Sequence, residues 1–381
     1  MYNQLRKKTF YMLCYLSFAI LLIISGCDSN DPNGNQFATL NEEIDYIADQ
    51  YLQVGLVIGI IDKQQHKHTF SYGTKSLGTN DLPDANTIFE IGSITKSFTA
   101  TLLADMYLKG NYTDDTVGHY LPAGQVTMPT RNNIEITFLQ LATHTSGLPR
   151  TPHESGSTFP RPNGYSDLNP YAAYTTEDVY NYLTDYCTLK FEPGTWWEYS
   201  NTGYGLLGHI IGLVDGTSYE SVLTRDLFQV LGMDNSSLFL TDQQMTNYSL
   251  GYNSSLQNVP YYTANDIFQG CGHIKSSLND MFKYLEANMG LTTTSLSNAM
   301  ELAHQPQMHQ GSMGDQGLAW YILELEDGQD IIYTGGDTNG QSAYLGFNPA
   351  ASTGIIILSN CAMHGAQLIM GPEILEAIMK Y

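Results

Sequence analysis

The spacing of hydrophobic residues changes several times along the chain. Between Leu40 and Tyr51 apolar residues recur at helical spacing, and two runs rich in β-branched and aromatic residues follow at 54–61 and 68–73. This order predicts a helix and then a hairpin of two strands. Strand patterns return late in the chain, at 319–325, 331–334, 342–347 and 354–358. A final helix is predicted at 372–379.

Between these ends, from residue 93 to about residue 288, the pattern favours helices and long loops. The expected fold class is therefore α/β, in the α+β sense, with an antiparallel sheet flanked by helices beside a mainly helical lobe. Residues 39–92 and 305–381 are expected to form the sheet lobe, and residues 93–304 the helical lobe. A cleft between two such lobes is a natural substrate site.

The helix predicted after residue 93 carries the first candidate chemistry. Apolar residues recur along it at i+4 from Ile94, and Gly110 supplies a stop. Ser93 and Lys96 lie three residues apart at its start, so their side chains share one face. A serine alcohol is a weak nucleophile until a neighbouring base takes its proton, and a neutral lysine amine can be that base. Ser93 also lies where unpaired backbone N–H groups of the helix point.

Two further segments carry groups that suit the same reaction. Tyr199 and Asn201 stand two residues apart just before an apolar, glycine-punctuated helix, so one loop can present a phenol and an amide to one point. The Asn201 amide is expected to donate to a substrate carbonyl and to help hold Lys96. The predicted strand at 331–337 ends in Gly335 and Gly336, whose small size lets a substrate lie along the strand edge. The N–H of Gly336 is then a candidate oxyanion donor beside that of Ser93.

Together these segments resemble the serine β-lactamase-like family, closest to the class C β-lactamases, the D-alanyl-D-alanine carboxypeptidases and endopeptidases, and related esterases. The resemblance covers about residues 40–380 and implies the two-lobed β-lactamase-like fold. Its motifs are Ser93-x-x-Lys96, Tyr199-x-Asn201 and Tyr333-Thr334-Gly335, with further landmarks at 141–148, 191–194 and 270–277.

The resemblance implies a role for each matching residue. Ser93 would be acylated by the substrate, and Lys96 and Tyr199 would share the work of the general base. Tyr199 would also activate water or hand a proton to the leaving group. Asn201 would orient the substrate amide, and the N–H groups of Ser93 and Gly336 would form the oxyanion hole.

The third motif departs from the family pattern at its first residue. The family usually has lysine or histidine there, and this chain has Tyr333, followed by Thr334 and Gly335 as expected substrate-binding residues. A lysine would supply a cation for a substrate carboxylate, and tyrosine supplies none at neutral pH. Two interpretations remain open. The substrate is an uncharged ester or amide, or another group handles the carboxylate, with the candidates His364, Asn360 and Asn339.

The N-terminus predicts export. A basic segment at 6–8 precedes an apolar run at 10–24 and a Ser-Gly-Cys ending at Cys27, which is typical of a secretory signal. The ending resembles a bacterial lipoprotein signal, so residues 1–26 are expected to be removed and Cys27 to be lipidated. The polar residues 27–38 read as a flexible tether. The expected location is extracytoplasmic, lipid-anchored to a bacterial membrane, in the periplasm or on the cell surface.

Charge and cysteine usage exclude several partners. The full chain carries a net charge of −22. Without the three basic residues of segment 1–26, 13 basic residues stand against 38 acidic ones, a net charge of −25. Such a surface repels nucleic acid and anionic lipid, so neither is an expected partner beyond the lipid anchor. Cys187, Cys271 and Cys361 form neither a disulfide framework nor a metal pattern.

Other hydrolase classes lack their sequence signals. No serine has glycine at both −2 and +2, which argues against an α/β-hydrolase. The nearest histidine pairs, His66 with His68 and His304 with His309, lack the arrangement of a zinc hydrolase, so no cofactor or metal is expected. The sequence predicts a serine hydrolase acting on D-Ala-D-Ala-type peptidoglycan peptides, small esters or amides, with β-lactams as possible acylating agents. The alternative is a non-catalytic, penicillin-binding or wall-sensing lipoprotein.

Overall fold

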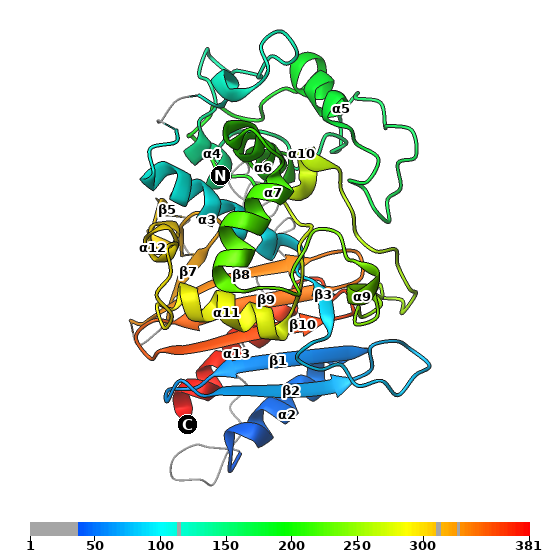
Figure 1. Ribbon diagram of the computed structural model, residues 1–381, viewed down its shortest axis with the longest axis vertical. Coiled ribbons are helices and arrows are strands. Elements are labelled where there is room, and N and C mark those ends of the chain that lie inside the picture. Colours follow the sequence, from blue (N-terminus) through cyan, green and yellow to red (C-terminus); the bar gives the residue numbers. More distant parts are fainter. Residues whose placement is uncertain (1–36, 113–115, 310–313, 326–327) are drawn as a thin grey trace, which may run out of the picture.

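The computed structural model describes residues 37–112, 116–309, 314–325 and 328–381 (Figure 1). The predicted signal segment, Cys27 and most of the predicted tether lie outside the described residues. Within them, the largest element is one sheet to which both ends of the chain contribute. Its strands, in spatial order, are β2 (Lys67–Gly73), β1 (Gly55–Ile61), β10 (Thr353–Ser359), β9 (Ser342–Asn348), β8 (Asp330–Asp337), β7 (Tyr321–Glu324), β6 (Asp315–Gln316) and β5 (Met308–His309).

Every neighbouring pair in this sheet is antiparallel. The sheet and the helices around it confirm the fold class predicted from the sequence. The central strands are buried on both faces, so their residues alternate between two cores. In β1, Val57 and Ile61 join the core shared with the helical part, whereas Leu56, Ile58 and Ile60 join the core on the opposite face.

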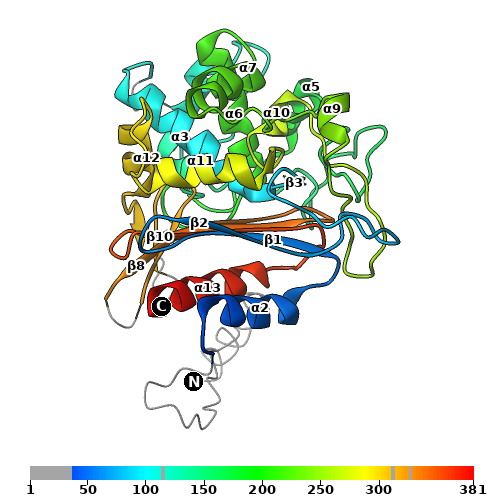
Figure 2. The same cartoon turned by 60° about the horizontal axis from the view of Figure 1, so that its bottom comes forward.

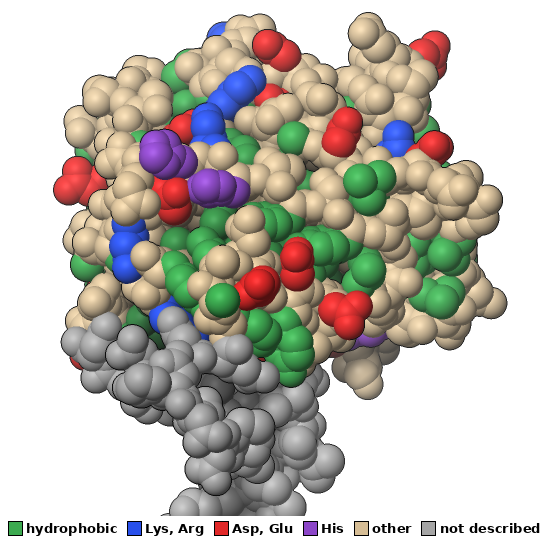
Figure 3. All heavy atoms as spheres, turned by 90° about the horizontal axis from the view of Figure 1, so that it is seen from below, with side chains coloured by type: hydrophobic (Ala, Val, Ile, Leu, Met, Phe, Trp, Pro, Cys, Tyr) green, Lys and Arg blue, Asp and Glu red, His purple; other side chains and the backbone are tan. Residues whose placement is uncertain are grey.

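Helices α2 (Leu40–Tyr51) and α13 (Gln367–Lys380) cover that opposite face side by side (Figure 2). The Thr39 hydroxyl caps α2 by accepting the N–H of Glu42 at 3.2 Å. The end of the molecule that carries α2 and β2 shows acidic side chains beside hydrophobic ones (Figure 3). The ring of its exposed aromatic residue Tyr46 packs at a tilt against Phe37, with the ring centroids 5.0 Å apart.

The last helix begins earlier than the sequence predicts. The sequence pattern predicts a start at about Pro372, and proline is favoured in the first turn of a helix. In the structure α13 begins at Gln367 and Pro372 lies inside it. Gly371 packs on the ring of Tyr344 so closely that an added Cβ would lie 2.3 Å from a ring carbon. Burial of this face against the sheet thus outweighs the preference of the proline for a first turn.

The helical part lies on the other side of the sheet (Figure 2), where α11 rests on the sheet. A two-stranded sheet of β3 (Ile88–Glu90) and β4 (Lys275–Ser277) leads into it. The helices of this part are α3 (Thr95–Leu108), α4 (Phe138–Ala142), α5 (Thr176–Asn181), α6 (Asn201–Asp215), α7 (Tyr219–Leu223), α8 (Gln229–Leu231), α9 (Asp242–Met245), α10 (Asp266–Gln269), α11 (Leu278–Asn288) and α12 (Ser297–His304).

Candidate active site

Ser93 lies in a short 3₁₀ turn, Gly92–Ile94, between β3 and α3. Gly92 adopts a φ of +50°, and an added Cβ there would lie 2.7 Å from the backbone nitrogen of Asp337 in β8. Only glycine combines that conformation with such a close approach. The serine is therefore held at the seam between the start of a helix and the end of a sheet strand.

The structure brings Ser93, Lys96 and Tyr199 together. The Lys96 ammonium donates to the Ser93 Oγ at 3.0 Å, and the Tyr199 hydroxyl donates to the same oxygen at 2.6 Å. Lys96 is buried and also donates to the backbone carbonyl of Cys271. Two groups able to move a proton thus meet one alcohol, although Tyr199 stands 106 residues away along the chain.

His144 binds the residues directly before and after Tyr199. The His144 carbonyl accepts the N–H of Glu198 at 2.9 Å, and its Nδ1 accepts the N–H of Ser200 at 3.1 Å. The His144 ring also packs 4.4 Å from the Tyr199 ring. Burial, followed by the charges of Lys96 and Arg150, lowers the pKa of His144 well below its ordinary value. The imidazole is therefore neutral, which leaves Nδ1 free to accept.

Asn201 begins α6 beside Tyr199, but its amide has a different partner from the one expected. Its Nδ2 donates to the hydroxyl of the buried Tyr171 at 2.6 Å, and no hydrogen bond joins it to Lys96 among the described residues. Its Oδ1 is buried without a hydrogen-bond partner within the same part of the chain. A buried acceptor left unpaired is costly, so this oxygen suits a donor on a bound ligand.

The sheet supplies backbone to the site through the end of β8. An added Cβ on Gly336 would lie 2.0 Å from the Ile91 carbonyl oxygen and 2.7 Å from the Ser93 nitrogen. The backbones of Gly336 and Ser93 therefore lie in close contact, and such proximity is one condition for an oxyanion hole built from both residues. Thr334 shares the strand face of Gly336, because residues two apart in a strand point to the same side.

Tyr333 and Gly335 face the other side of β8. An added Cβ on Gly335 would lie 2.5 Å from Leu368 in α13, and the Tyr333 ring packs between Tyr321 and Tyr344 with centroids 5.6 and 5.8 Å apart. Burial raises the pKa of Tyr333, so the phenol stays neutral. The structure thus places this aromatic residue in a packed stack and gives it no hydrogen bond to the Ser93 group among the described residues.

The other groups considered for carboxylate binding lie in different settings. Asn360 is buried, and its Nδ2 donates to the carbonyls of Thr74 and Lys75 and to the Ser249 hydroxyl. That amide is a structural tie, so Asn360 is not free to bind a substrate. The Asn339 amide donates to the Asp167 carbonyl at 2.9 Å. His364 lies near Asp337 and opposes the rise that burial causes in the pKa of that carboxyl.

Sequence reasoning missed Arg150, which lies next to Tyr199. The guanidinium carbon of Arg150 lies 4.8 Å from the Tyr199 ring centroid, and the Lys96 nitrogen lies at the same distance. Each of these cations would stabilise negative charge on the phenol oxygen. The only sequence signal was an arginine two residues after the landmark at 141–148, and nothing in its spacing connected it to residue 199.

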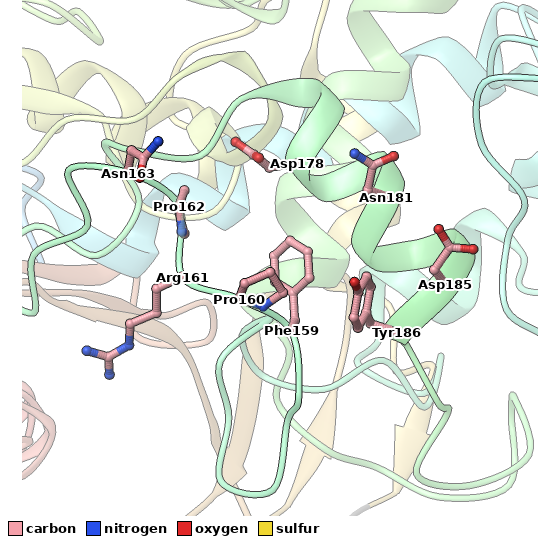
Figure 4. Close-up of a pocket in the computed structure, with 9 residues that line it drawn as sticks. All are labelled: Phe159, Pro160, Arg161, Pro162, Asn163, Asp178, Asn181, Asp185 and Tyr186. Carbon is pink, nitrogen blue, oxygen red and sulfur yellow. The ribbon is translucent and has the colours of Figure 1, made fainter.

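Features outside this site do not compete with it. Among the described residues, no group of three or more acidic, histidine or cysteine side chains suits a metal ion, and no helix is long and apolar enough to cross a membrane. A surface hollow of about 440 Å³ is lined by residues 159–163, 178, 181, 185 and 186, none of them a predicted site residue (Figure 4). Cys271 and Cys361 are buried and Cys187 is half-buried, all three as free thiols.

Comparison with known proteins identifies a matching family model and several similar proteins. A family model described as Beta-lactamase matches residues 41–372. A beta-lactamase of Lysobacter lactamgenus is 26% identical over 356 residues, covering 85% of this chain and 86% of its own. The D-alanyl-D-alanine-carboxypeptidase/endopeptidase AmpH of Escherichia coli strain K12 is 24% identical, with 80% and 78% covered. A solved class C beta-lactamase shares 25% identity at a TM-score of 0.74, covering 88% of this chain and 94% of that one.

Proposed function

Since the chain belongs to the beta-lactamase family, we propose that it is a serine hydrolase that cleaves an acyl bond through a covalent intermediate on Ser93. The observation that carries this proposal is the pair of hydrogen bonds to the Ser93 Oγ, 3.0 Å from Lys96 and 2.6 Å from Tyr199. A capping serine beside a solvated lysine would need neither the burial of Lys96 nor a phenol from a distant loop.

In the first step the Lys96 and Tyr199 pair holds one proton fewer, as a neutral lysine amine or a tyrosine phenolate; the Ser93 Oγ attacks the carbonyl carbon of the substrate, and its proton passes to this pair. The bond from that carbon to the leaving group breaks as the pair returns a proton to the departing nitrogen or oxygen. Water then attacks the Ser93 ester and gives its proton to the same pair. This restores the serine hydroxyl and releases the acid product.

The negative charge that develops on the carbonyl oxygen needs donors placed in advance. The N–H groups of Ser93 and Gly336 are the proposed donors, and the close approach of the two backbones supports the assignment. Asn201 is proposed to bind a substrate amide, since its buried Oδ1 lacks a partner within the described residues. Thr334 and Gly335 belong to the strand along which an extended substrate would lie.

The proposed substrate class is a D-Ala-D-Ala-type peptidoglycan peptide or a small ester or amide, with β-lactams as acylating agents. The named relatives support this range, because they include beta-lactamases and a D-alanyl-D-alanine-carboxypeptidase/endopeptidase. Tyr333 favours a second candidate, a protein that binds such ligands without turning them over, because it replaces the cation usual in the family.

A single experiment distinguishes the serine hydrolase from the non-catalytic binding protein. The full chain is mixed with a fluorescent penicillin or a 4-nitrophenyl ester, and its intact mass and ester hydrolysis are followed. A serine hydrolase gains the mass of the acyl group or releases nitrophenol, and Ser93→Ala does neither while keeping its melting temperature. Wild-type protein that neither gains mass nor hydrolyses the ester would favour the non-catalytic binding protein.

We also propose that the mature protein is held outside the cytoplasm by a lipid on Cys27, after removal of residues 1–26. The basic, apolar and small-residue order of the N-terminus supports this location. In a bacterial host, wild-type protein is expected in the membrane fraction, labelled by a fatty-acid analogue. Cys27→Ser should lose the label and leave that fraction, and equal labelling of both proteins would contradict the proposal.

A further inference from the structure

Arg150 is fixed by the segment that carries Tyr199. Its carbonyl oxygen accepts the N–H of Asn201 at 3.0 Å and that of Thr202 at 3.1 Å, at the start of α6. Its own N–H donates to the Glu154 carboxylate at 2.8 Å. The backbone of Arg150 is thus tied to the first turn of the helix that follows the catalytic loop, so its position relative to Tyr199 is built into the fold.

The guanidinium itself has no anionic partner among the described residues. It lies over the Tyr199 ring with its carbon 4.8 Å from the centroid, and the residue is exposed. No hydrogen bond or ion pair joins it to any residue that the structure describes. The other arginines of the described chain all bind oxygen: Arg131 the carbonyls of Leu189 and Lys190, Arg161 the carboxylate of Asp167, and Arg225 those of Asp215 and Asp226.

An unpaired arginine is unexpected in a chain where 38 acidic residues face 16 basic ones. Its five N–H donors form a planar fork that matches a carboxylate in two parallel hydrogen bonds. The charge also acts at the end of β8, because it opposes the rise that burial causes in the pKa of Asp337. The cation therefore lies against the Tyr199 ring and within electrostatic range of the strand along which a substrate would lie.

We propose that Arg150 binds a carboxylate of the substrate. It would thereby replace the cation that the third motif of this chain lacks. This inference rests on the proposed function, since it assumes that Ser93 is acylated. The Tyr199 ring supports the planar guanidinium, which leaves the donor edge of Arg150 free for the ligand. Tyr333 cannot compete for the carboxylate, because it is neutral and packed between Tyr321 and Tyr344.

The carboxylate has two possible sources, the leaving group or the acyl group of the substrate. Two matched pairs of aryl esters distinguish them. The 3-carboxyphenyl and phenyl esters of phenylacetic acid differ by a carboxylate on the leaving group. The 4-nitrophenyl esters of adipic and hexanoic acid differ by a carboxylate on the acyl chain. For each pair, the ratio of kcat/KM between the charged and the uncharged ester measures recognition of that carboxylate.

Arg150→Ala is expected to lower this ratio about 10- to 100-fold for one of the two pairs, chiefly through KM, as loss of charge-assisted hydrogen bonds predicts. Arg150→Lys should keep part of the ratio, because it keeps the charge and loses the planar fork. The matched control is Arg161→Ala, which removes an exposed arginine lying 4.4 Å from the Tyr165 ring beside the hollow of Figure 4. This control should leave both ratios within about twofold of wild type.

Three results would overturn the proposal, and they have two different meanings. If the wild type hydrolyses the esters in a Ser93-dependent way but Arg150→Ala changes neither ratio, Arg150 is no carboxylate anchor and the hydrolase assignment stands. A ratio that falls equally in Arg161→Ala leads to the same conclusion. If the wild type hydrolyses none of the esters faster than Ser93→Ala, the proposed function fails and this inference fails with it.

Discussion

The Nδ1 of His144 accepts the backbone N–H of Ser200 at 3.1 Å, so a neutral imidazole fixes the residue next to Tyr199. His144→Ala should therefore let the Tyr199 loop shift and lower kcat about 10- to 100-fold with a smaller change in KM. His144→Asn should recover part of the rate, since asparagine offers an acceptor and tolerates the φ of +59° found there. Steady-state kinetics on a 4-nitrophenyl ester test this, with the exposed His119→Ala as control. Equal rates for His144→Ala and wild type would show that the loop needs no such support.

Removing the Tyr199 hydroxyl should affect chemistry more than structure. Tyr199→Phe keeps the ring that packs on His144 and removes the oxygen 2.6 Å from the Ser93 Oγ. The acylation rate should fall about 10²- to 10⁴-fold, as expected when a positioned proton carrier is lost. Timed intact-mass measurements with a penicillin give this rate. Tyr186→Phe, which alters an exposed tyrosine, should acylate as fast as wild type. A Tyr199→Phe rate equal to wild type would leave Lys96 as the sole base.

A methyl group at position 336 should disturb the seam between β8 and Ser93. In Gly336→Ala the Cβ would lie 2.0 Å from the Ile91 carbonyl oxygen, so the two backbones must separate. We expect kcat/KM to fall at least about 100-fold through the oxyanion hole, together with a lower melting temperature. Gly118→Ala is the matched control, because its Cβ would meet nothing closer than 3.7 Å. Wild-type kinetics in Gly336→Ala would remove this residue from the oxyanion hole.

Acid should destabilise the fold through buried histidines. Burial lowers the pKa of His304 to about 4, and its Nε2 lies 3.0 Å from the Asn288 amide oxygen. Because the pKa in the unfolded chain is about 6.5, this histidine does not lower the free energy of unfolding above that pH. Between pH 6.5 and 4 the unfolded chain binds a proton that the fold excludes, so stability falls, by about 2 kcal/mol at pH 5.

His304→Gln removes this titrating group and keeps a hydrogen-bond donor near Asn288. Denaturant unfolding at pH 7.5 and pH 5.0 should show a smaller acid-induced loss of stability in the variant than in wild type. His144 and His273 act in the same direction, because burial lowers the pKa of both well below the ordinary value. The variant should therefore retain some acid sensitivity, and a pH dependence identical to wild type would contradict the contribution of His304.

A cation at position 333 should not restore carboxylate recognition. The side chain there faces away from Ser93 and packs between Tyr321 and Tyr344. Tyr333→Lys should therefore leave the kcat/KM ratio of carboxylate-bearing to uncharged esters unchanged, at a cost in stability of about 1–3 kcal/mol from loss of the packed ring. In the Arg150→Ala background the ratio should stay at the low value of that variant, and a rise of the ratio in either background would show that position 333 reaches the substrate carboxylate.

Local sequence patterns predicted the parts of the structure that depend on local spacing. Ser93 and Lys96 meet because they are three residues apart at a helix start, and the buried strands follow runs of β-branched residues. The motif order also placed Tyr199 correctly, since the resemblance carries information that spacing alone does not. The first helix likewise spans Leu40–Tyr51, the segment over which apolar residues recur at helical spacing.

Contacts between distant segments were not predictable in the same way. Arg150 reaches the Tyr199 ring, and His144 reaches Ser200, through loop geometry that no periodic pattern encodes. The amide of Asn201 was expected to help hold Lys96, but it binds Tyr171, one of 27 tyrosines with no distinguishing sequence signal. The direction of Tyr333 follows from the register of β8 against β9, which a short strand with two glycines leaves open.

The helical part and the sheet contribute differently to the site around Ser93. The hydrogen bonds that hold Ser93, Lys96 and Tyr199 in place come from Cys271, His144 and each other, all within the helical part. At Gly336 the sheet meets this trio with its backbone. Side chains of the strand can therefore vary without rearranging the nucleophile, which explains how a tyrosine can occupy the usual place of a cation while the reactive group stays assembled.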